Sequence, residues 1–167
     1  MQLSLRDRSD PRTGCVSQKI TDPPDIIVSM SSIITFTSDF GIQGHYTGEV
    51  KGAILSITPE AKIVDISHQV GAHNLLEAAY VIAQAYRAFV PRTVHLLVVD
   101  PGVGSSRRGL VVEAEHHFFV APDNGILSLI FAEAEVQDVI SIEAEHYFRR
   151  PVSPTFHARD IFAPVAA

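Results

Sequence analysis

The sequence predicts an α/β fold in which a mostly parallel sheet is flanked by helices. From residue 32 onward, short runs of β-forming residues alternate with segments of helical periodicity. The order strand, helix, strand, helix, strand is typical of right-handed crossovers that connect parallel strands. The chain has 167 residues, of which 46% are hydrophobic and 19% charged, so it suits one globular domain with a single core.

The first strand and helix follow from composition and spacing. IITFTS (Ile33–Ser38) is rich in β-branched residues and predicts a strand. The segment YTGEVKGAILSI, residues 46–57, predicts a helix that Pro59 ends. Its apolar residues recur at helical spacing, at Val50, Ala53, Ile54 and Ile57.

The next three elements repeat this alternation. KIVDIS, residues 62–67, predicts a second strand. NLLEAAYVIAQAYRAF, residues 74–89, predicts a helix with Asn74 as its N-cap and Pro91 as its stop. TVHLLVVD, residues 93–100, predicts a third strand.

The last part of the chain predicts a hairpin followed by two helical segments. Residues 109–122 read as two strands joined by a tight turn at Glu115 and His116, and Asp123-Asn124-Gly125 forms a second turn. ILSLIFAEA, residues 126–134, predicts a short helix. SPTFHARDIFAPVAA begins as an extended loop and predicts an apolar helix from near Arg159.

These patterns divide the chain into two parts. Residues 1–31 mix charges and prolines without periodicity, so we expect a disordered or spurious N-terminal extension and a natural start at Met30. Residues 32–167 are expected to form the α/β domain. Because the final helical pattern runs to Ala167 without a stop signal, we expect this domain to be truncated at its C-terminal end.

Charge and composition argue against several partners. The net charge is −6 and the lysines and arginines do not cluster, so no nucleic-acid partner is expected. No apolar run approaches the roughly 18 residues of a membrane span, so no membrane partner is expected. The single cysteine, Cys15, allows no internal disulfide, and we therefore expect a cytoplasmic protein.

Polar residues follow each of the three predicted parallel strands. They are Asp39 after the first strand, Ser67-His68 after the second and Asp100 after the third. Ligands bind beyond the carboxyl ends of such strands, so these positions predict a site. Asp39 suits a carboxylate that accepts hydrogen bonds from vicinal hydroxyls, and an N-cap of the following helix is the alternative.

The remaining motifs restrict the chemistry. The eight histidines show no metal-ligand spacing, and His95 reads as a structural histidine within a strand. His157 stands in a loop near a helix start and is either functional or a hydrogen-bonded loop residue. Neither GIQGHYTG nor DPGVGSSRR fits the triphosphate or dinucleotide loops. Because no nucleophile elbow is present either, water is the expected nucleophile if the protein is an enzyme.

Five motifs occur together in a familiar order: TSDFG, VDISH, VVDPGVGSSRR, APDNG and PTFHARDIFAP. In order and spacing they resemble the S-adenosyl-L-methionine hydroxide adenosyltransferase family, the adenosine-forming S-adenosylmethionine (SAM) hydrolases related to the fluorinases and chlorinases. The resemblance covers about residues 33–167.

The resemblance implies that hydroxide attacks C5' of the SAM ribose, that methionine leaves and adenosine forms, and that no metal or other cofactor takes part. It implies a water-positioning triad of Asp100, Arg107 and His157, with Arg108 left as a solvent-facing neighbour. It also implies a set of substrate-binding residues: Asp39 at the ribose hydroxyls, Tyr46 near the methionine end, and Thr155 and Phe156 around the ribose and C5'.

The resemblance also implies a larger assembly. Family members carry a second, β-rich C-terminal domain that contacts adenine, and they form homotrimers with sites between subunits; this chain stops before that domain, so alone it should bind substrate poorly. His73 stands where the family usually has an aromatic residue. An inactive truncated binding or assembly module is the alternative function. A SAM-dependent halogenase is disfavoured, because halogenating relatives carry an aromatic residue at the position of Asp100 and have changed the histidine at position 157.

Overall fold

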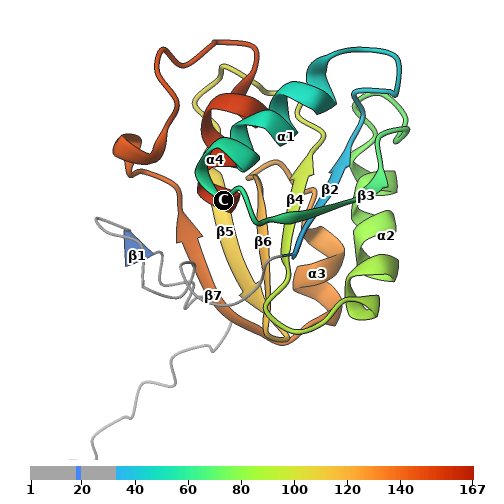
Figure 1. Ribbon diagram of the computed structural model, residues 1–167. Helices are drawn as coiled ribbons and strands as arrows, with labels where there is room; N and C mark the ends of the chain where they lie inside the picture. Colours follow the sequence, from blue (N-terminus) through green and yellow to red (C-terminus); the bar gives the residue numbers. More distant parts are fainter. Residues whose placement is uncertain (1–17, 20–32) are drawn as a thin grey trace, which may run out of the picture.

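The computed structural model describes residues 18–19 and 33–167, and this part of the chain forms a three-layer α/β/α arrangement (Figure 1). A seven-stranded sheet has the order β1-β7-β5-β6-β4-β2-β3. Its strands are β1 (Gln18–Lys19), β2 (Ile33–Ser38), β3 (Lys62–Ser67), β4 (Val94–Val98), β5 (Gly109–Ala114), β6 (His117–Pro122) and β7 (Val136–Ser141). Four strand pairs are parallel, and only the two pairs made by β5 are antiparallel. The predicted α/β class with a mostly parallel sheet is therefore confirmed.

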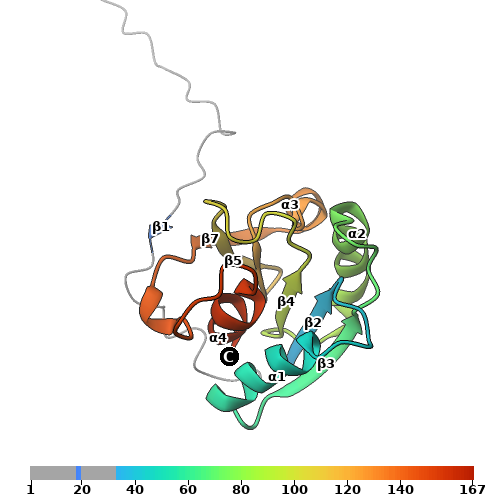
Figure 2. The same cartoon turned by 90° about the horizontal axis from the view of Figure 1, so that it is seen from above.

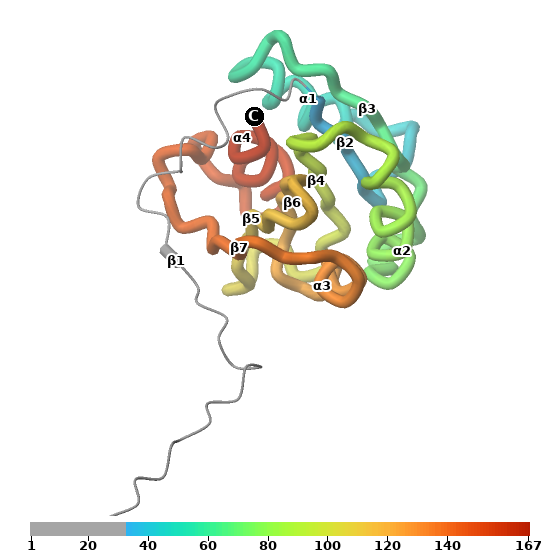
Figure 3. Tube along the Cα trace, turned by 90° about the horizontal axis from the view of Figure 1, so that it is seen from below, coloured from blue at the N-terminus to red at the C-terminus, as the bar shows by residue number. Residues whose placement is uncertain are grey.

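Helices cover both faces of the sheet. They are α1 (Tyr46–Ile57), α2 (Leu75–Ala85), α3 (Ser128–Glu133) and α4 (Ala163–Ala166), and a π-helical turn (Ala158–Phe162) leads into α4. Seen from above, α1 and α4 lie on one face of the sheet and α2 and α3 on the other (Figure 2). The view from below shows the same two helix pairs on opposite sides (Figure 3).

Each face of the sheet has its own hydrophobic core, because strand side chains alternate between the faces. Phe36, Leu96 and Val120 point toward α1 and the π-helical turn, where they pack with Ile54 and Phe162. On the opposite face, their sequence neighbours Leu97, Phe119 and Ala121 pack with Ile82 and Ile130 of α2 and α3. The central strands are thus buried on both sides, as parallel strands under helices require.

Most predicted boundaries agree with the structure. The first strand, the helix over residues 46–57 and the second strand have the expected limits. Asn74 caps α2 as expected, since its Oδ1 accepts the Glu77 backbone N–H at 3.2 Å. The predicted hairpin turn lies at Glu115 and His116, whose φ angles of 47° and 63° suit the turn types that join two-residue hairpins.

Strand β7 was not expected from the sequence. Its register places Ile140 beside Val111 and Asp138 beside Glu113 of β5. Only Ser141 of its six residues is fully buried, so the strand carries no strong apolar pattern. Residues 18–19 form β1 beside β7, whereas the rest of the proposed N-terminal extension, with Cys15 and Met30, lies outside the described residues. The prediction about that extension stays a prediction.

No helix within residues 18–19 and 33–167 has the length and apolar character needed to cross a bilayer.

The buried His95 predicts a pH-dependent stability. Its side chain is 0% exposed, and its ring nitrogens lie 2.7 Å from Thr35 Oγ1 and 3.1 Å from His117 Nδ1. His95 is therefore the structural histidine expected from its strand. Burial, with a smaller contribution from His117, lowers the pKa of His95 from its ordinary 6.5 to about 3.

The unfolded chain takes up this proton near pH 6.5, whereas the folded chain resists it down to about pH 3. Stability contributed by the neutral ring is thus complete above pH 6.5 and is lost as the pH falls through this window. Urea unfolding should give a free energy of unfolding about 2 kcal/mol lower at pH 5 than at pH 7.5 from His95 alone. A His95→Gln variant should show a smaller difference between the two pH values, and an unchanged difference would contradict the assignment.

Candidate active site

The candidate site lies where the strand order reverses. From β2 the chain passes through α1 to β3 on one side, and then through α2 to β4 on the other side of β2. Ser38 at the end of β2 pairs with Val98 at the end of β4, which brings Asp39 and Asp100 to the same sheet edge. Such a switch point beyond the carboxyl ends of the strands is where open α/β sheets bind ligands.

A pocket of about 510 Å³ occupies this position. Of the seven residues predicted for the site, six line it: Asp39, Tyr46, Asp100, Thr155, Phe156 and His157. The seventh, Arg107, contacts Asp100 and His157 directly. The structure therefore brings all seven predicted residues together. The other lining residues are Phe40, His45, Glu49, Ala72, His73, Val98, Val103, Ser153, Ala158 and Arg159.

Asp100, Arg107 and His157 form a connected array at one wall of the pocket. Arg107 Nε lies 2.8 Å from both carboxylate oxygens of Asp100, and Arg107 Nη2 contacts Asp100 Oδ2 as well. The same Nη2 lies 2.9 Å from His157 Nδ1. The side chains of Asp100 and Arg107 are only 5% and 10% exposed. This is a buried ion pair, in which each charge depends on the other for compensation.

The array defines the protonation of His157. Arginine only donates hydrogen bonds, so Nδ1 of His157 must accept the Arg107 N–H, and the proton of the neutral ring lies on Nε2. Burial and then the positive charge of Arg107 lower the pKa of His157, and Asp100 and Asp160 oppose this effect. The ring is therefore kept neutral, with Nε2–H available as a donor.

Asp39 is held by the loop that precedes α2. Its Oδ2 accepts the backbone N–H of His73 at 2.9 Å, and His73 has a left-handed φ of 61°. The alternative role as a helix N-cap is not what the structure has, since α1 starts after His45 and has no side-chain cap. The lone pairs of Asp39 that do not face His73 can accept hydrogen bonds from a ligand in the pocket.

Three aromatic rings form an apolar wall. The Tyr46 and Phe156 centroids lie 5.2 Å apart, and each lies 6.0 Å from Phe40. All three rings meet edge to face or tilted, as aromatic pairs prefer. The pocket thus combines one apolar wall with carboxylates at Asp39 and Asp100.

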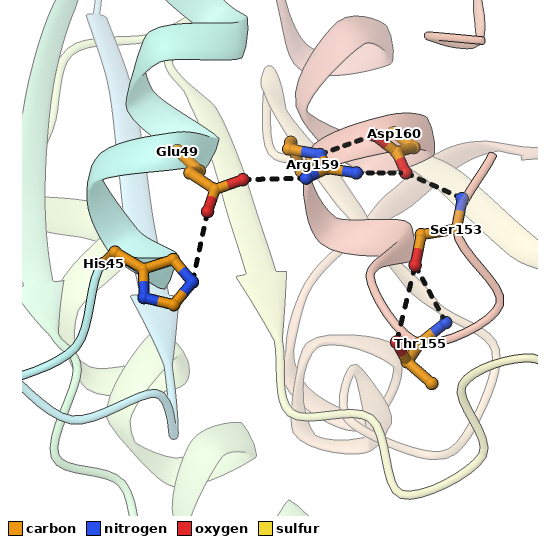
Figure 4. Close-up of polar contacts among 6 residues, drawn as sticks. All are labelled: His45, Glu49, Ser153, Thr155, Arg159 and Asp160. Atoms are coloured by element: carbon orange, nitrogen blue, oxygen red, sulfur yellow. Dashed lines mark hydrogen bonds and ion pairs between the residues drawn. The ribbon is translucent and has the colours of Figure 1, made fainter. Parts of the chain in front are cut away.

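A polar wall links α1 to the loop that carries His157 (Figure 4). Arg159 lies 2.7 Å from Glu49 of α1 and also makes two hydrogen bonds to Asp160. Glu49 in turn lies 3.2 Å from His45 Nε2. No sequence pattern indicates this wall, because Glu49 and Arg159 are 110 residues apart.

The second polar position predicted from the strand ends does not line the pocket. His68 is buried, and its Nδ1 lies 2.8 Å from Ser38 Oγ. The His68 carbonyl accepts the Gly41 N–H at 2.7 Å. His68 therefore supports the loop that carries Asp39.

The DPGVG turn requires glycine at position 104. Gly104 has a φ of 79°, in the left-handed region, and a Cβ there would overlap the Pro154 carbonyl oxygen. This close approach brings the Asp100 turn against the segment that carries Thr155 and His157. Arg108, expected to face solvent, is more than half exposed and lies 2.6 Å from Asp123.

Within the described residues, no group of three or more His, Cys, Asp or Glu side chains is placed to hold a metal ion.

Comparison with known proteins places the chain in a family. The model of the SAM hydroxide adenosyltransferase N-terminal domain matches residues 34–167. The chain belongs to this family. The family assignment agrees with the resemblance carried by the five sequence motifs.

Curated relatives of the chain include two proteins named (R)-S-adenosyl-L-methionine hydrolase. The one from Methanocaldococcus jannaschii is 41% identical over 140 residues, which are 81% of this chain and 52% of the relative. The one from Salinispora tropica is 38% identical over 80% of this chain and 51% of the relative. A fluorinase from Nocardia brasiliensis is 25% identical over 78% of this chain. The chain spans about half the length of the curated relatives it matches.

Solved structures show the same arrangement. An uncharacterized conserved protein from Thermotoga maritima superposes with a TM-score of 0.78 at 44% identity, over 80% of this chain and 51% of that protein. A conserved hypothetical protein from Thermus thermophilus gives a TM-score of 0.66 at 34% identity, over the same shares. The domain corresponds to about half of each of these larger chains.

Proposed function

We propose that the protein hydrolyses SAM to adenosine and L-methionine by attack of water on C5' of the ribose. The observation that carries this proposal is the Asp100–Arg107–His157 array, which borders a pocket lined by aromatic rings and by the carboxylates of Asp39 and Asp100. The hydrolase names of relatives at 41% and 38% identity support the same activity.

The array suits the positioning of one water molecule. The Nε2–H of neutral His157 would donate to the water oxygen, while the carboxylate of Asp100 would accept one of its protons. As the new O–C5' bond forms and the C5'–S bond breaks, Asp100 takes that proton and the sulfonium electron pair leaves with methionine. Arg107 orients the Asp100 carboxylate and holds the His157 tautomer.

We propose that no cofactor takes part. The sulfonium of SAM is already a good leaving group, so the protein has to supply position and a partly water-excluded environment. Asp39 would bind the ribose hydroxyls, Thr155 and Phe156 would surround the ribose and C5', and Tyr46 would lie near the methionine end. These placements are supported by their positions on one pocket.

Halide transfer is less consistent with this site. A halide nucleophile would have to approach the anionic carboxylate of Asp100, which is 5% exposed. Like charges repel strongly in such a poorly solvated position. The fluorinase relative is also more distant than the hydrolases, at 25% identity.

The direct test incubates the full-length protein with SAM in ¹⁸O-enriched water and follows the products by mass spectrometry. Adenosine labelled at its 5'-hydroxyl, together with an equal amount of methionine, is the expected result. Formation of 5'-chloro-5'-deoxyadenosine in chloride buffer would favour a halogenase instead. Tight binding of SAM without turnover would favour a non-catalytic binding module.

The proposal includes a homotrimeric assembly in the cytoplasm, with neither nucleic acid nor membrane as partner. The resemblance to the family supports the trimer. The net charge of −6 and its dispersed basic residues disfavour a nucleic-acid partner. Light scattering of the purified protein would test the assembly, and a monomer would contradict it.

Asp39 should act mainly on binding. An Asp39→Asn variant keeps the size of the side chain but removes the charge that strengthens its hydrogen bonds to ribose hydroxyls. We expect KM for SAM to rise roughly 10-fold or more, with a smaller change in kcat. Steady-state kinetics would show this. A fall in kcat at constant KM would instead place Asp39 at the reacting centre.

A further inference from the structure

A fully buried carboxylate lies beside the loop that carries His157. Asp160 is 0% exposed, and its Oδ2 accepts the backbone N–H of Ser153 at 2.8 Å. Arg159 adds two hydrogen bonds, from Nε to Oδ1 at 2.7 Å and from Nη2 to Oδ2 at 2.9 Å. A buried charge needs such compensation. Burial would raise the pKa of Asp160, but the bonds from Arg159 and Ser153 outweigh it and keep that pKa below its ordinary value.

The same guanidinium reaches across to helix α1. Arg159 Nη1 lies 2.7 Å from Glu49 Oε2 (Figure 4). The guanidinium carbon of Arg159 lies 4.9 Å from the ring centroid of Phe156. The side chain of Arg159 is only 24% exposed. Arg159 therefore contacts three things at once: α1, the buried Asp160 and the aromatic wall of the pocket.

These contacts enclose a short segment. Asp160 binds the chain on both sides of residues 153–157. Its Oδ2 accepts the Ser153 N–H at the start of the segment, and its Oδ1 accepts the Nε–H of Arg159, two residues after His157. Thr155 is tied into the same turn, because its N–H lies 3.3 Å from Ser153 Oγ. The side chain of His157 itself has one hydrogen bond among the described contacts, to Arg107. Its position therefore depends on the backbone of this segment.

We propose that Arg159 is a positioning residue for the reaction, and that its bridge from Asp160 to Glu49 holds the segment carrying Phe156 and His157 at a set distance from α1 and Asp100. This inference rests on the proposed function. Arg159 does not act on the reacting atoms. Its bonds to Asp160 and Glu49 occupy Nε and both terminal nitrogens of the guanidinium.

The chain offers a matched control in Arg87. Arg87 also makes two hydrogen bonds to one carboxylate, that of Glu115, at 3.1 and 2.9 Å. Its guanidinium carbon likewise lies 4.8 Å from an aromatic centroid, that of Tyr86. Neither Arg87 nor Glu115 lines the pocket. Arg87→Met thus removes a similar set of contacts away from the site.

The test compares kcat, KM and thermal stability for Arg159→Met, Arg159→Lys, Glu49→Gln and Arg87→Met. Misplacement of a reacting group by about 1 Å can cost up to about 100-fold in rate, so Arg159→Met should lower kcat roughly 10-fold or more. Arg159→Lys should recover part of this loss. Arg87→Met should keep kcat within about two-fold even if it lowers Tm, as expected of a peripheral ion pair.

A double-mutant cycle tests the bridge itself. Glu49→Gln should lower kcat severalfold in the wild-type background and have little further effect once Arg159 is methionine, because the two residues act through one contact. Glu49→Gln leaves the Arg159–Asp160 pair intact. If Arg159→Met does not fold, the effect of Glu49→Gln on kcat therefore still tests the bridge. Additive effects of the two substitutions on kcat would overturn the proposal.

An NMR titration of His157 separates this inference from the proposed function. A loosened segment should admit water and move the His157 midpoint upward, since burial, followed by the charge of Arg107, lowers its pKa in the intact site. An unchanged midpoint together with a kcat like that of Arg87→Met would overturn the role of Arg159. Absence of adenosine from the wild-type protein would contradict the proposed function alone, and the titration would still decide the positioning role.

Discussion

An Asp100→Asn variant is expected to lose about three orders of magnitude in kcat for adenosine release. The amide is nearly isosteric with the carboxylate, but it cannot take the proton of the attacking water, a contribution typically of about 10²–10⁴-fold. It also leaves the charge of Arg107, which is 10% exposed, without its compensating partner. Steady-state release of adenosine, measured by chromatography, would give the loss.

Asp123→Asn is the matched control for this substitution. Asp123 forms an ion pair with Arg108 at 2.6 Å, much as Asp100 does with the neighbouring arginine, Arg107. Unlike Asp100, Asp123 lies outside the pocket, and its side chain is one-third exposed. It should keep kcat near the wild-type value. Full activity of Asp100→Asn would sink the proposed role of the array, and equal losses in both variants would point to a general effect on stability.

Gly104→Ala should be among the most damaging single substitutions in the DPGVG turn. The residue has a φ of 79°, and a side chain there would overlap the carbonyl oxygen of Pro154, which is backbone and cannot rotate away. The left-handed conformation costs about 1–2 kcal/mol for an L-residue. Overlap typically adds about 1–3 kcal/mol. We expect the free energy of unfolding to fall by about 3 kcal/mol, and kcat to fall because the segment before His157 must move.

Gly125→Ala separates the two costs. Gly125 also has a left-handed φ, of 94°, but a Cβ there would meet no heavy atom within 4 Å. Its loss in urea unfolding should be about 1–2 kcal/mol, without the cost of overlap. If the free energy of unfolding falls by the same amount in both variants, the Pro154 carbonyl moves aside at little cost, and the turn does not depend on its close contact with Gly104.

The degree to which the fold was predictable differs along the chain. Segments with strong local patterns, such as Ile33–Ser38 and the helix capped by Asn74, have the boundaries expected from residue order. Strand β7 was missed because its apolar residues do not alternate regularly: Ile140 packs against one core, whereas Val136 and Val139 pack against the other. Its place between β1 and β5 follows from pairing with distant segments.

The site residues could be identified from the sequence where they lie in recognisable motifs. Asp100 and Arg107 are seven residues apart on one turn, and His157 stands in a recognisable loop. The roles of these residues came from the resemblance, since residue types alone left His157 open as a structural loop histidine. The structure brings the three side chains together, and the orientation of His157 follows from the donor-only chemistry of Arg107.

Residue order by itself determined the α/β class, most element boundaries and the motifs that carry the family resemblance. These properties depend on local backbone preferences and on the spacing of apolar residues, and both can be read from a short stretch of consecutive residues. Only the tertiary structure decided the tautomer of His157, the tie between Asp39 and His73, and the bridge from Asp160 through Arg159 to Glu49. Each of these depends on the distance between atoms of segments far apart in the chain, and packing of α1 and the final turn against one face of the sheet sets that distance.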